Sequence, residues 1–150
     1  MTLKNKIPPP LVTLFFGAMI YYSTVLIPSV SFKHQCLLAV LVVIMGIAII
    51  LSAILTFRRL QTTVNPLQPT KATSLAISGI FRLSRNPMYL GMLLILIAVS
   101  LASGAVAGLL LLPAFIAYIT FFQILPEELA MRELFSDQYA EYCKKVRRWI

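Results

Sequence analysis

Acidic residues are scarce in this sequence, and residues 1–126 contain none. All five lie in the last part of the chain: Glu127, Glu128, Glu133, Asp137 and Glu141. Proton-coupled pumps and small multidrug exporters normally need a carboxylate inside a membrane span, where it binds protons or cations. Because the apolar segments identified below carry no carboxylate, the sequence disfavours a transporter.

Cysteine and histidine are also rare, since the chain has only Cys36, Cys143 and one histidine, His34. No CxxC pair is present, and the topology argued below places the two cysteines on opposite sides of a membrane. A single histidine at a loop or helix end is usually a polar surface residue. We therefore expect neither a disulfide nor a metal site.

Charged residues make up 12% of the chain, whereas a soluble domain carries roughly 25%. Hydrophobic residues make up 59%, and 13 basic residues give a formal net charge of +8. Such a charge is typical of proteins that bind nucleic acid or a membrane surface. Here the basic residues flank long apolar runs and do not share a polar face with aromatic residues, so we expect membrane lipids and no nucleic acid as partners.

The chain has room for a single domain, residues 1–150. A membrane helix needs about 20 mainly apolar residues. Four apolar stretches come close to this length, at about 11–30, 36–57, 87–103 and 105–125. The first follows three prolines, which suit a helix start. We predict an all-α integral membrane fold with about four transmembrane helices and a cytoplasmic C-terminal amphipathic helix.

Two alternatives concern these stretches. Only Ser103 and Gly104 separate the last two, which allows a tight helical hairpin or one bent segment. We favour the hairpin, because a helix over 87–125 would be about 58 Å long, far beyond the hydrocarbon core of about 30 Å. The first stretch could be a signal peptide, but its apolar part is too long and it ends in a poor cleavage site at Pro28-Ser29-Val30.

Gly104 and Gly108 have the GxxxG spacing that lets helices approach closely. This spacing is compatible with a homodimer through the Gly104–Gly108 face. A turn glycine followed by a packing glycine explains the pattern equally well.

Basic residues collect on the cytoplasmic side of membrane proteins. With four spans, the N-terminus, the central loop and the C-terminus share one side. That side holds twelve of the thirteen basic residues, and the other side holds only Lys33. We therefore predict a multi-pass protein with both termini in the cytoplasm.

Two polar segments remain on this side, the loop 58–86 and the tail 126–150. The tail reads as a helix that starts at Pro126, with acidic residues in its first part and basic residues in its last. One apolar stripe follows it: Phe135, Tyr139, Tyr142, Val146 and Trp149. A basic amphipathic helix of this kind would lie on or fold under the membrane surface.

Simple explanations exist for the conspicuous residues of both segments. Glu127 and Glu128 suit the positive end of a helix. Arg85 and Tyr89 suit a stop charge and an interfacial aromatic residue at a membrane boundary. From pattern alone, these structural explanations would be preferred.

The order of the two segments nevertheless resembles a known family. The first motif reads Gly79-x-Phe81-x-x-x-Arg85-Asn86-Pro87-x-Tyr89-x-Gly91. It resembles the G-x-Y-x-x-x-R-H-P-x-Y-x-G motif of isoprenylcysteine carboxyl methyltransferases and their relatives, which include phospholipid N-methyltransferases. The second, from Pro126 to Trp149, resembles that family's E-E-x-x-L-x-x-x-F-G-x-x-Y-x-x-Y-x-x-x-V ending. The likeness covers roughly residues 62–150, with the cofactor region at 62–91 and 123–150.

This resemblance implies a membrane-embedded methyltransferase that uses S-adenosylmethionine without a Rossmann domain, and the chain has no GxGxxG. Glu127 would complement the positive charges of the cofactor, and Arg85 could complement its carboxylate. Asn65 or Gln68 could add a polar contact. The implied cofactor-binding residues are Thr73, Ser74, Leu75, Ala76, Phe81, Asn86, Pro87, Met88, Tyr89, Glu127 and Glu128.

Three positions depart from the family pattern. Asn86 replaces a histidine and cannot act as a base. Phe81 replaces a tyrosine and lacks its hydroxyl. Gln123 stands where the carboxyl methyltransferases carry an arginine thought to hold the substrate. We expect Arg85, Asn86 and Gln123 as the catalytic residues. Because these departures include the loss of that arginine, a prenylated cysteine substrate becomes doubtful.

We therefore expect methyl transfer from S-adenosylmethionine to a lipophilic acceptor at the cytoplasmic membrane boundary. Methylation of a lipid amine is a second enzymatic possibility. A non-catalytic membrane subunit that packs through the Gly104–Gly108 face is the alternative from another class.

Overall fold

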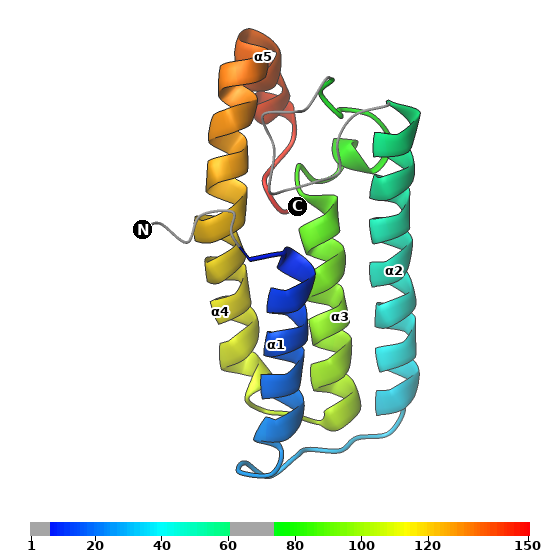
Figure 1. The fold of residues 1–150 in the computed structure, drawn as a ribbon. Coiled ribbons are helices and arrows are strands. Elements are labelled where there is room, and N and C mark those ends of the chain that lie inside the picture. The colour runs from blue at the N-terminus through cyan, green and yellow to red at the C-terminus, as the bar shows by residue number, and fades with distance from the viewer. Residues whose placement is uncertain (1–6, 61–73) are drawn as a thin grey trace.

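The computed structural model describes residues 7–60 and 74–150, and within these ranges every regular element is helical. Four helices lie side by side and alternate in direction (Figure 1). They are α1 (Pro9–Ser23), α2 (Gln35–Arg59), α3 (Pro87–Ser103) and α4 (Gly108–Ile119). A π-helical turn, η3 (Thr120–Ile124), joins α4 to α5 (Leu125–Lys145), and a short 3₁₀ turn, η2 (Gly79–Arg82), precedes α3. The predicted all-α fold is confirmed.

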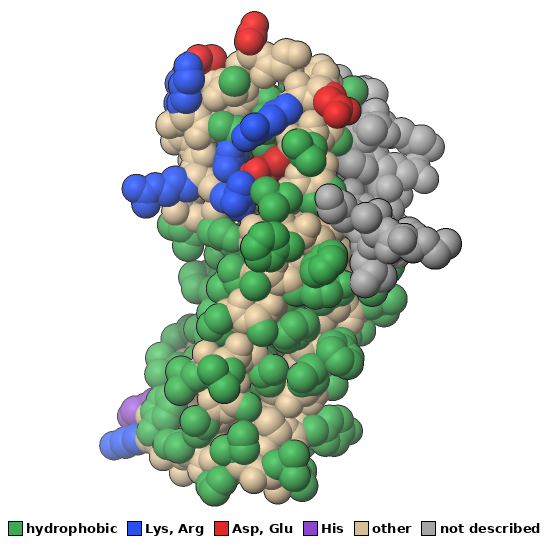
Figure 2. All heavy atoms as spheres, turned by 90° about the vertical axis from the view of Figure 1, so that its left-hand side faces the viewer, with side chains coloured by type: hydrophobic (Ala, Val, Ile, Leu, Met, Phe, Trp, Pro, Cys, Tyr) green, Lys and Arg blue, Asp and Glu red, His purple; other side chains and the backbone are tan. Residues whose placement is uncertain are grey.

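The surface of the bundle is apolar along most of its length. Two helical runs are long and apolar enough to cross a membrane, α2 and the continuous run Gly108–Lys145. In α2 only 17% of the most apolar stretch is buried within the molecule, whereas a core helix of a soluble protein is mostly buried. Hydrophobic side chains cover the bundle, and charged side chains gather at one end (Figure 2). This distribution is that of a membrane protein, and four spans stay a prediction.

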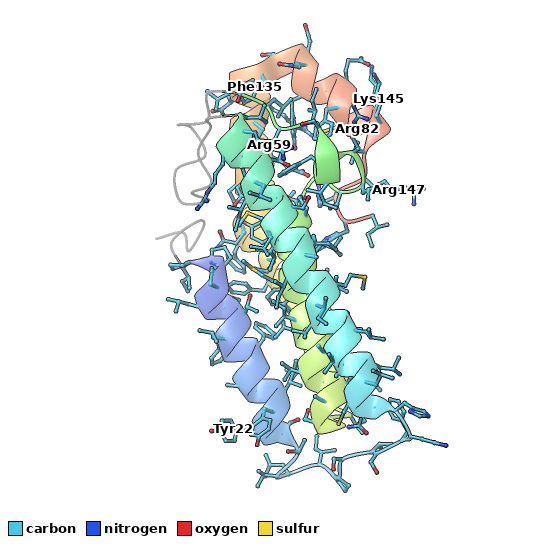
Figure 3. All side chains as sticks on the ribbon, turned by 90° about the vertical axis from the view of Figure 1, so that its right-hand side faces the viewer. Tyr22, Arg59, Arg82, Phe135, Lys145 and Arg147 are labelled. Atoms are coloured by element: carbon cyan, nitrogen blue, oxygen red, sulfur yellow. The ribbon has the colours of Figure 1, made fainter. Side chains whose placement is uncertain are left out.

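The charged end is the end at which α2 finishes and α5 begins to bend. Figure 3 shows Arg59, Arg82, Lys145 and Arg147 together there, with Tyr22 at the opposite end of the bundle. The described parts of the central loop, residues 58–60 and 74–86, therefore meet the tail at one end, as the sequence predicted.

Helix α1 ends at Ser23, several residues before the expected end of the first stretch. The hydroxyls of Ser23 and Thr24 donate to the carbonyls of Ile20 and Tyr21, at 2.6 and 2.7 Å. Such local hydrogen bonds compete with helix continuation. The chain then crosses the end of the bundle, where the Val30 amide donates to the Gly104 carbonyl at 2.9 Å.

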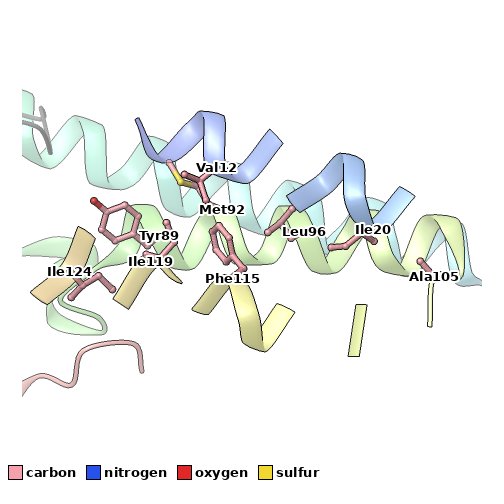
Figure 4. Close-up of a cluster of buried hydrophobic side chains, with 9 residues drawn as sticks. All are labelled: Val12, Ile20, Tyr89, Met92, Leu96, Ala105, Phe115, Ile119 and Ile124. Atoms are coloured by element: carbon pink, nitrogen blue, oxygen red, sulfur yellow. The ribbon is translucent and has the colours of Figure 1, made fainter. Parts of the chain in front are cut away.

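Helix α3 is at the centre of the bundle and packs against both α1 and α2. Its side chains Tyr89, Met92 and Leu96 join buried residues of α1 and α4 in one core (Figure 4). Towards α2 the contact is made by glycines. A Cβ atom at Gly91 would lie 2.5 Å from Ile50 Cγ1 and 2.7 Å from the Gly46 carbonyl oxygen. The two helices therefore approach to backbone contact.

A helical hairpin joins α3 to α4, as predicted. Gly104 ends α3 with φ of 65°, and a Cβ atom there would lie 2.2 Å from the Val30 carbonyl oxygen. A Cβ atom at Gly108 would lie 2.0 Å from Ser100 Oγ. Both glycines thus have close neighbours in their own chain. A homodimer through this face stays a prediction.

The expected tail helix does not start afresh at Pro126, because the helix is continuous from Gly108 to Lys145. A proline inside a helix lacks an N–H group and its ring clashes with the carbonyl four residues earlier. The π turn widens the helix just before Pro126, and the Leu125 amide donates to Thr120. Further on, Ser136 has φ of 35° and ψ of −110°, so α5 bends sharply there.

Candidate functional site

The site begins at a sharp corner before α3. Asn86 lies outside the helical region, with φ of −128° and ψ of 56°, because the following proline disfavours helical geometry at this residue. Pro87 then begins α3, and the Asn86 amide donates to Ser84 Oγ at 3.1 Å. Ser84 is fully buried, which anchors this corner in the interior. The corner fixes the direction of the first turn of α3, which carries Tyr89.

Tyr89 points at α5. Its hydroxyl donates a hydrogen bond to Glu127 Oε1, so the first turns of α3 and α5 are joined by a pair of side chains. Glu127 lies beyond Leu125, where the fourth predicted span ends. Burial, and secondarily the charge of Glu128, raise the pKa of the Glu127 carboxyl to about 8. Within the described ranges no basic side chain forms an ion pair with Glu127.

Glu128, the next residue, is buried between two arginines. Arg85 NH2 lies 3.0 Å from Glu128 Oε1. Arg148 donates from Nε to Oε1 at 3.0 Å and from NH2 to Oε2 at 2.8 Å, which is a bidentate pair. The Glu128 carboxylate raises the pKa of the Arg148 guanidinium. Arg85 also donates to Cys143 Sγ through NH1, and its Nε is buried without a partner in the described part of the chain.

The chain after α5 closes over the same corner through backbone contacts. The Arg85 amide donates to the Arg147 carbonyl at 3.1 Å. The Arg148 carbonyl accepts from Asn86 Nδ2 at 2.9 Å and from Ser84 Oγ at 3.4 Å. Sequence reasoning used Arg148 only as part of a basic cluster. Its one distinguishing signal was its place in a motif that resembles the ending of the family.

The residues before the corner form a second group of contacts. Ala76 and Phe81 are buried against Ala53 of α2, with Met88 packed beside them. The Tyr142 hydroxyl donates to the Phe81 carbonyl at 2.6 Å. The predicted apolar stripe of the tail therefore packs against the chain itself, since Tyr139, Tyr142 and Val146 form a buried cluster with Leu75, Met131, Phe135 and Cys143.

Gln123 is fully buried in the π turn, four residues before Glu127. Its Nε2 donates to the Ile7 carbonyl at 2.8 Å, which orients the amide towards the start of α1. Its Oε1 is buried and has no hydrogen-bond partner among residues 7–60 and 74–150. A buried carbonyl oxygen without a donor is uncommon and requires an explanation.

The structure thus brings together Arg85, Asn86, Tyr89, Glu127 and Glu128 from distant parts of the sequence. Ser74 lies in the preceding segment, where its hydroxyl donates to the Leu60 carbonyl at 3.2 Å. Thr73, Asn65 and Gln68 lie outside the described residues. No group of three or more His, Cys, Asp or Glu side chains suited to a metal occurs in residues 7–60 and 74–150.

A cationic cofactor fits this arrangement. Glu127 is a partly buried carboxyl whose hydrogen-bond partner is a neutral phenol, and a carboxylate in such a place is stabilised by a positive charge. S-adenosylmethionine carries both an ammonium and a sulfonium. Among the described residues, the pair Tyr89–Glu127 and the adjoining Asn86 corner suit such a cofactor.

Comparison with known proteins agrees with the geometry. The profile of the phospholipid methyltransferase family matches residues 34–138, a range that contains both Tyr89 and Glu127. An uncharacterised protein of Haemophilus influenzae is 44% identical over 63 residues, which are 42% of this chain and the whole of that protein. No solved structure matches. The family match covers more than half of the chain, and the chain therefore belongs to the phospholipid methyltransferase family of membrane methyltransferases.

Proposed function

We propose that this protein transfers the methyl group of S-adenosylmethionine to a lipophilic acceptor at the cytoplasmic membrane boundary. The observation that carries the proposal is the Tyr89–Glu127 pair, which a side-chain hydrogen bond joins. The fold places the pair at the junction of α3 and α5. Membership of a methyltransferase family supports the same activity.

The proposed role of the protein is to bind, orient and exclude water. S-adenosylmethionine supplies a methyl group that is activated by its sulfonium. Glu127 holds the positive end of the cofactor, and Tyr89 keeps the carboxylate oriented through its hydroxyl. In-line displacement needs correct alignment more than added chemistry, so positioning provides most of the catalysis. No described side chain has to serve as a nucleophile.

The four-span topology completes this proposal. Both termini and the polar end, with its basic side chains, would face the cytoplasm, where the cofactor is available. The acceptor would enter from the bilayer, because the outer surface of the bundle is apolar up to that end. The cofactor would then approach the corner at Asn86 from the cytoplasm, and the acceptor would approach it from the bilayer.

Methylation of a lipid amine is a second candidate for the acceptor. It is favoured by the family's description and by the buried Oε1 of Gln123, which receives no hydrogen bond from the described residues. A carbonyl oxygen accepts a hydrogen bond from an amine or a hydroxyl but repels a carboxylate. An amine acceptor must lose a proton before or during transfer, whereas a carboxylate needs no base. Carboxylate acceptors are thus disfavoured here.

Labelled methyl transfer tests the proposal directly. Purified protein in lipid nanodiscs is incubated with methyl-labelled S-adenosylmethionine and a membrane extract, and the labelled product is identified. We expect label in a lipid fraction, lost in Glu127→Gln and kept in Glu133→Gln, whose side chain is exposed on the same helix. Folded protein that neither binds the demethylated cofactor nor labels any lipid would instead indicate a non-catalytic membrane subunit.

A further inference from the structure

Arg148 lies outside the residues matched by the family profile, yet it touches the site at two points. Its guanidinium binds Glu128 in a bidentate pair at 2.8 and 3.0 Å. Its carbonyl accepts from Asn86 Nδ2 at 2.9 Å. We propose that Arg148 is a positioning residue of the cofactor site, an inference that rests on the proposed function.

The adjacent glutamates Glu127 and Glu128 have different partners. Both Glu128 oxygens are occupied, Oε1 by Arg85 and Arg148, and Oε2 by Arg148. Two arginines already balance the charge of Glu128, so a further cationic ligand gains less there than at a carboxylate without an arginine partner. Glu127 is bound only by the Tyr89 hydroxyl among the described side chains, so it is the carboxylate left for the cofactor. Arg148 maintains this difference between the two carboxylates because it binds both oxygens of Glu128.

The contacts of Glu128 also hold the first turn of α5 in position against α3. The side chain of Glu128 is only 7% exposed, and its anchors come from the corner and from the tail. Glu127 is its neighbour on the first turn of α5, so the orientation of Glu128 determines where the Glu127 carboxyl points. A buried carboxylate that loses one of two cationic partners is strongly destabilised. Without Arg148, Oε2 of Glu128 has no partner among the described residues, and this turn should shift.

Arg148 also holds the side-chain amide of Asn86. The Arg148 carbonyl accepts a hydrogen bond from Asn86 Nδ2, which orients the amide. The Arg85 amide is bound to Arg147 in the same segment. One short segment after α5 therefore fixes the residues on both sides of the corner, and Arg148 links that segment to α5 through Glu128.

Three variants of the full-length protein in lipid nanodiscs test the proposal. Arg148→Ala removes the bidentate pair, and Arg148→Lys keeps the charge without the two-pronged geometry. Lys145→Ala is the matched control, because it removes the same charge from an exposed side chain nearby (Figure 3). The measurements are the affinity for S-adenosylhomocysteine by calorimetry, KM and kcat for methyl transfer, and the thermal midpoint.

We expect Arg148→Ala to weaken S-adenosylhomocysteine binding and to raise KM for S-adenosylmethionine about tenfold or more, on the scale of a lost charge-assisted contact. At saturating cofactor kcat should fall much less, because the reacting groups remain. Arg148→Lys should lie between Ala and the unchanged protein, and Lys145→Ala should match the unchanged protein. Loss of packing alone would lower the thermal midpoint without this split between KM and kcat.

Unchanged KM and affinity in folded Arg148→Ala would overturn the positioning role while leaving the proposed function intact. If Arg148→Ala does not fold, Arg148→Lys and Glu128→Gln provide the same comparison, and normal cofactor affinity in both would overturn the inference. Failure of the unchanged protein to bind S-adenosylhomocysteine would instead contradict the proposed function, and the inference with it.

Discussion

The Tyr89 hydroxyl donates to the Glu127 carboxyl across 38 positions of sequence. This bond joins the first turn of α3 to the first turn of α5, directly beside the Asn86 corner. The carboxyl is held by a neutral phenol, while the neighbouring Glu128 takes the two arginines. This carboxyl forms no ion pair within residues 7–60 and 74–150, and it is the basis for the first two predictions.

Replacing Glu127 by Gln should weaken binding of S-adenosylmethionine or S-adenosylhomocysteine by about 1.5–3 kcal/mol, the scale of a hydrogen bond to a charged group. The amide keeps the size of the side chain but cannot carry a negative charge. Isothermal calorimetry on the purified protein measures the change, with Glu133→Gln as the matched control. Equal affinities in the two variants would mean that Glu127 serves only the start of α5.

Cofactor binding should release a proton near pH 7. Since burial raises the pKa of the Glu127 carboxyl to about 8, most molecules hold it protonated at pH 7 before binding. A positive charge beside it favours the ionised form and lowers the pKa, so the proton leaves. Above pH 8 the carboxylate is already charged, and the release should vanish.

Calorimetry in buffers of different ionisation enthalpy counts the released protons. S-adenosylmethionine should show the release, and Glu127→Gln should abolish it. A proton count that is the same at pH 7 and pH 9 would contradict the assignment of the released proton to Glu127.

The close contact of α2 and α3 predicts a strong effect of side chains at Gly91. A Cβ atom there would lie 2.5 Å from Ile50 Cγ1, so Gly91→Ala should destabilise the protein by about 1–3 kcal/mol, the usual cost of overpacking. Gly17→Ala is the control, because its Cβ would lie 3.5 Å from Leu96 Cδ2, an ordinary contact. Unfolding in detergent should separate the two variants, and a similar loss in both would argue against the glycine contact.

Sequence reasoning located the helical elements well where local signals were strong. Pro87 fixed the start of α3 and Gly104 fixed its end, because proline and positive φ restrict the backbone at single positions. The end of α1 and the π turn before Pro126 were missed, since both depend on competing hydrogen bonds and not on hydropathy. The two motifs indicated Tyr89 and Glu127, but their pairing needed the fold. The role of Arg148 could not be inferred, because its partners lie 20 and 62 residues away in sequence.

The bend in α5 predicts a stabilising substitution. Ser136 has φ of 35°, a region that favours glycine, and the family ending that the tail resembles has glycine at this place. Ser136→Gly should therefore stabilise the protein by up to about 1 kcal/mol. Ser136→Ala should give no such gain, because it keeps the Cβ atom. Thermal unfolding of the two variants measures the difference, and equal midpoints would show that the bend carries no strain.

The four-span topology predicts opposite reactivity of thiols at the two ends of the bundle. Cys36 lies at the start of α2 and is exposed, whereas Cys143 lies in α5 at the charged end. With both termini in the cytoplasm, a membrane-impermeant thiol reagent on intact cells should spare Cys143, and the same reagent on inverted vesicles should reach it.

Cys143 is partly buried and contacts Arg85, so local shielding by the protein would also prevent its labelling. A chain with both native cysteines replaced by serine and Lys145→Cys added removes this ambiguity, because residue 145 is exposed. Labelling of Lys145→Cys from outside intact cells would overturn the topology and with it the cytoplasmic placement of the site.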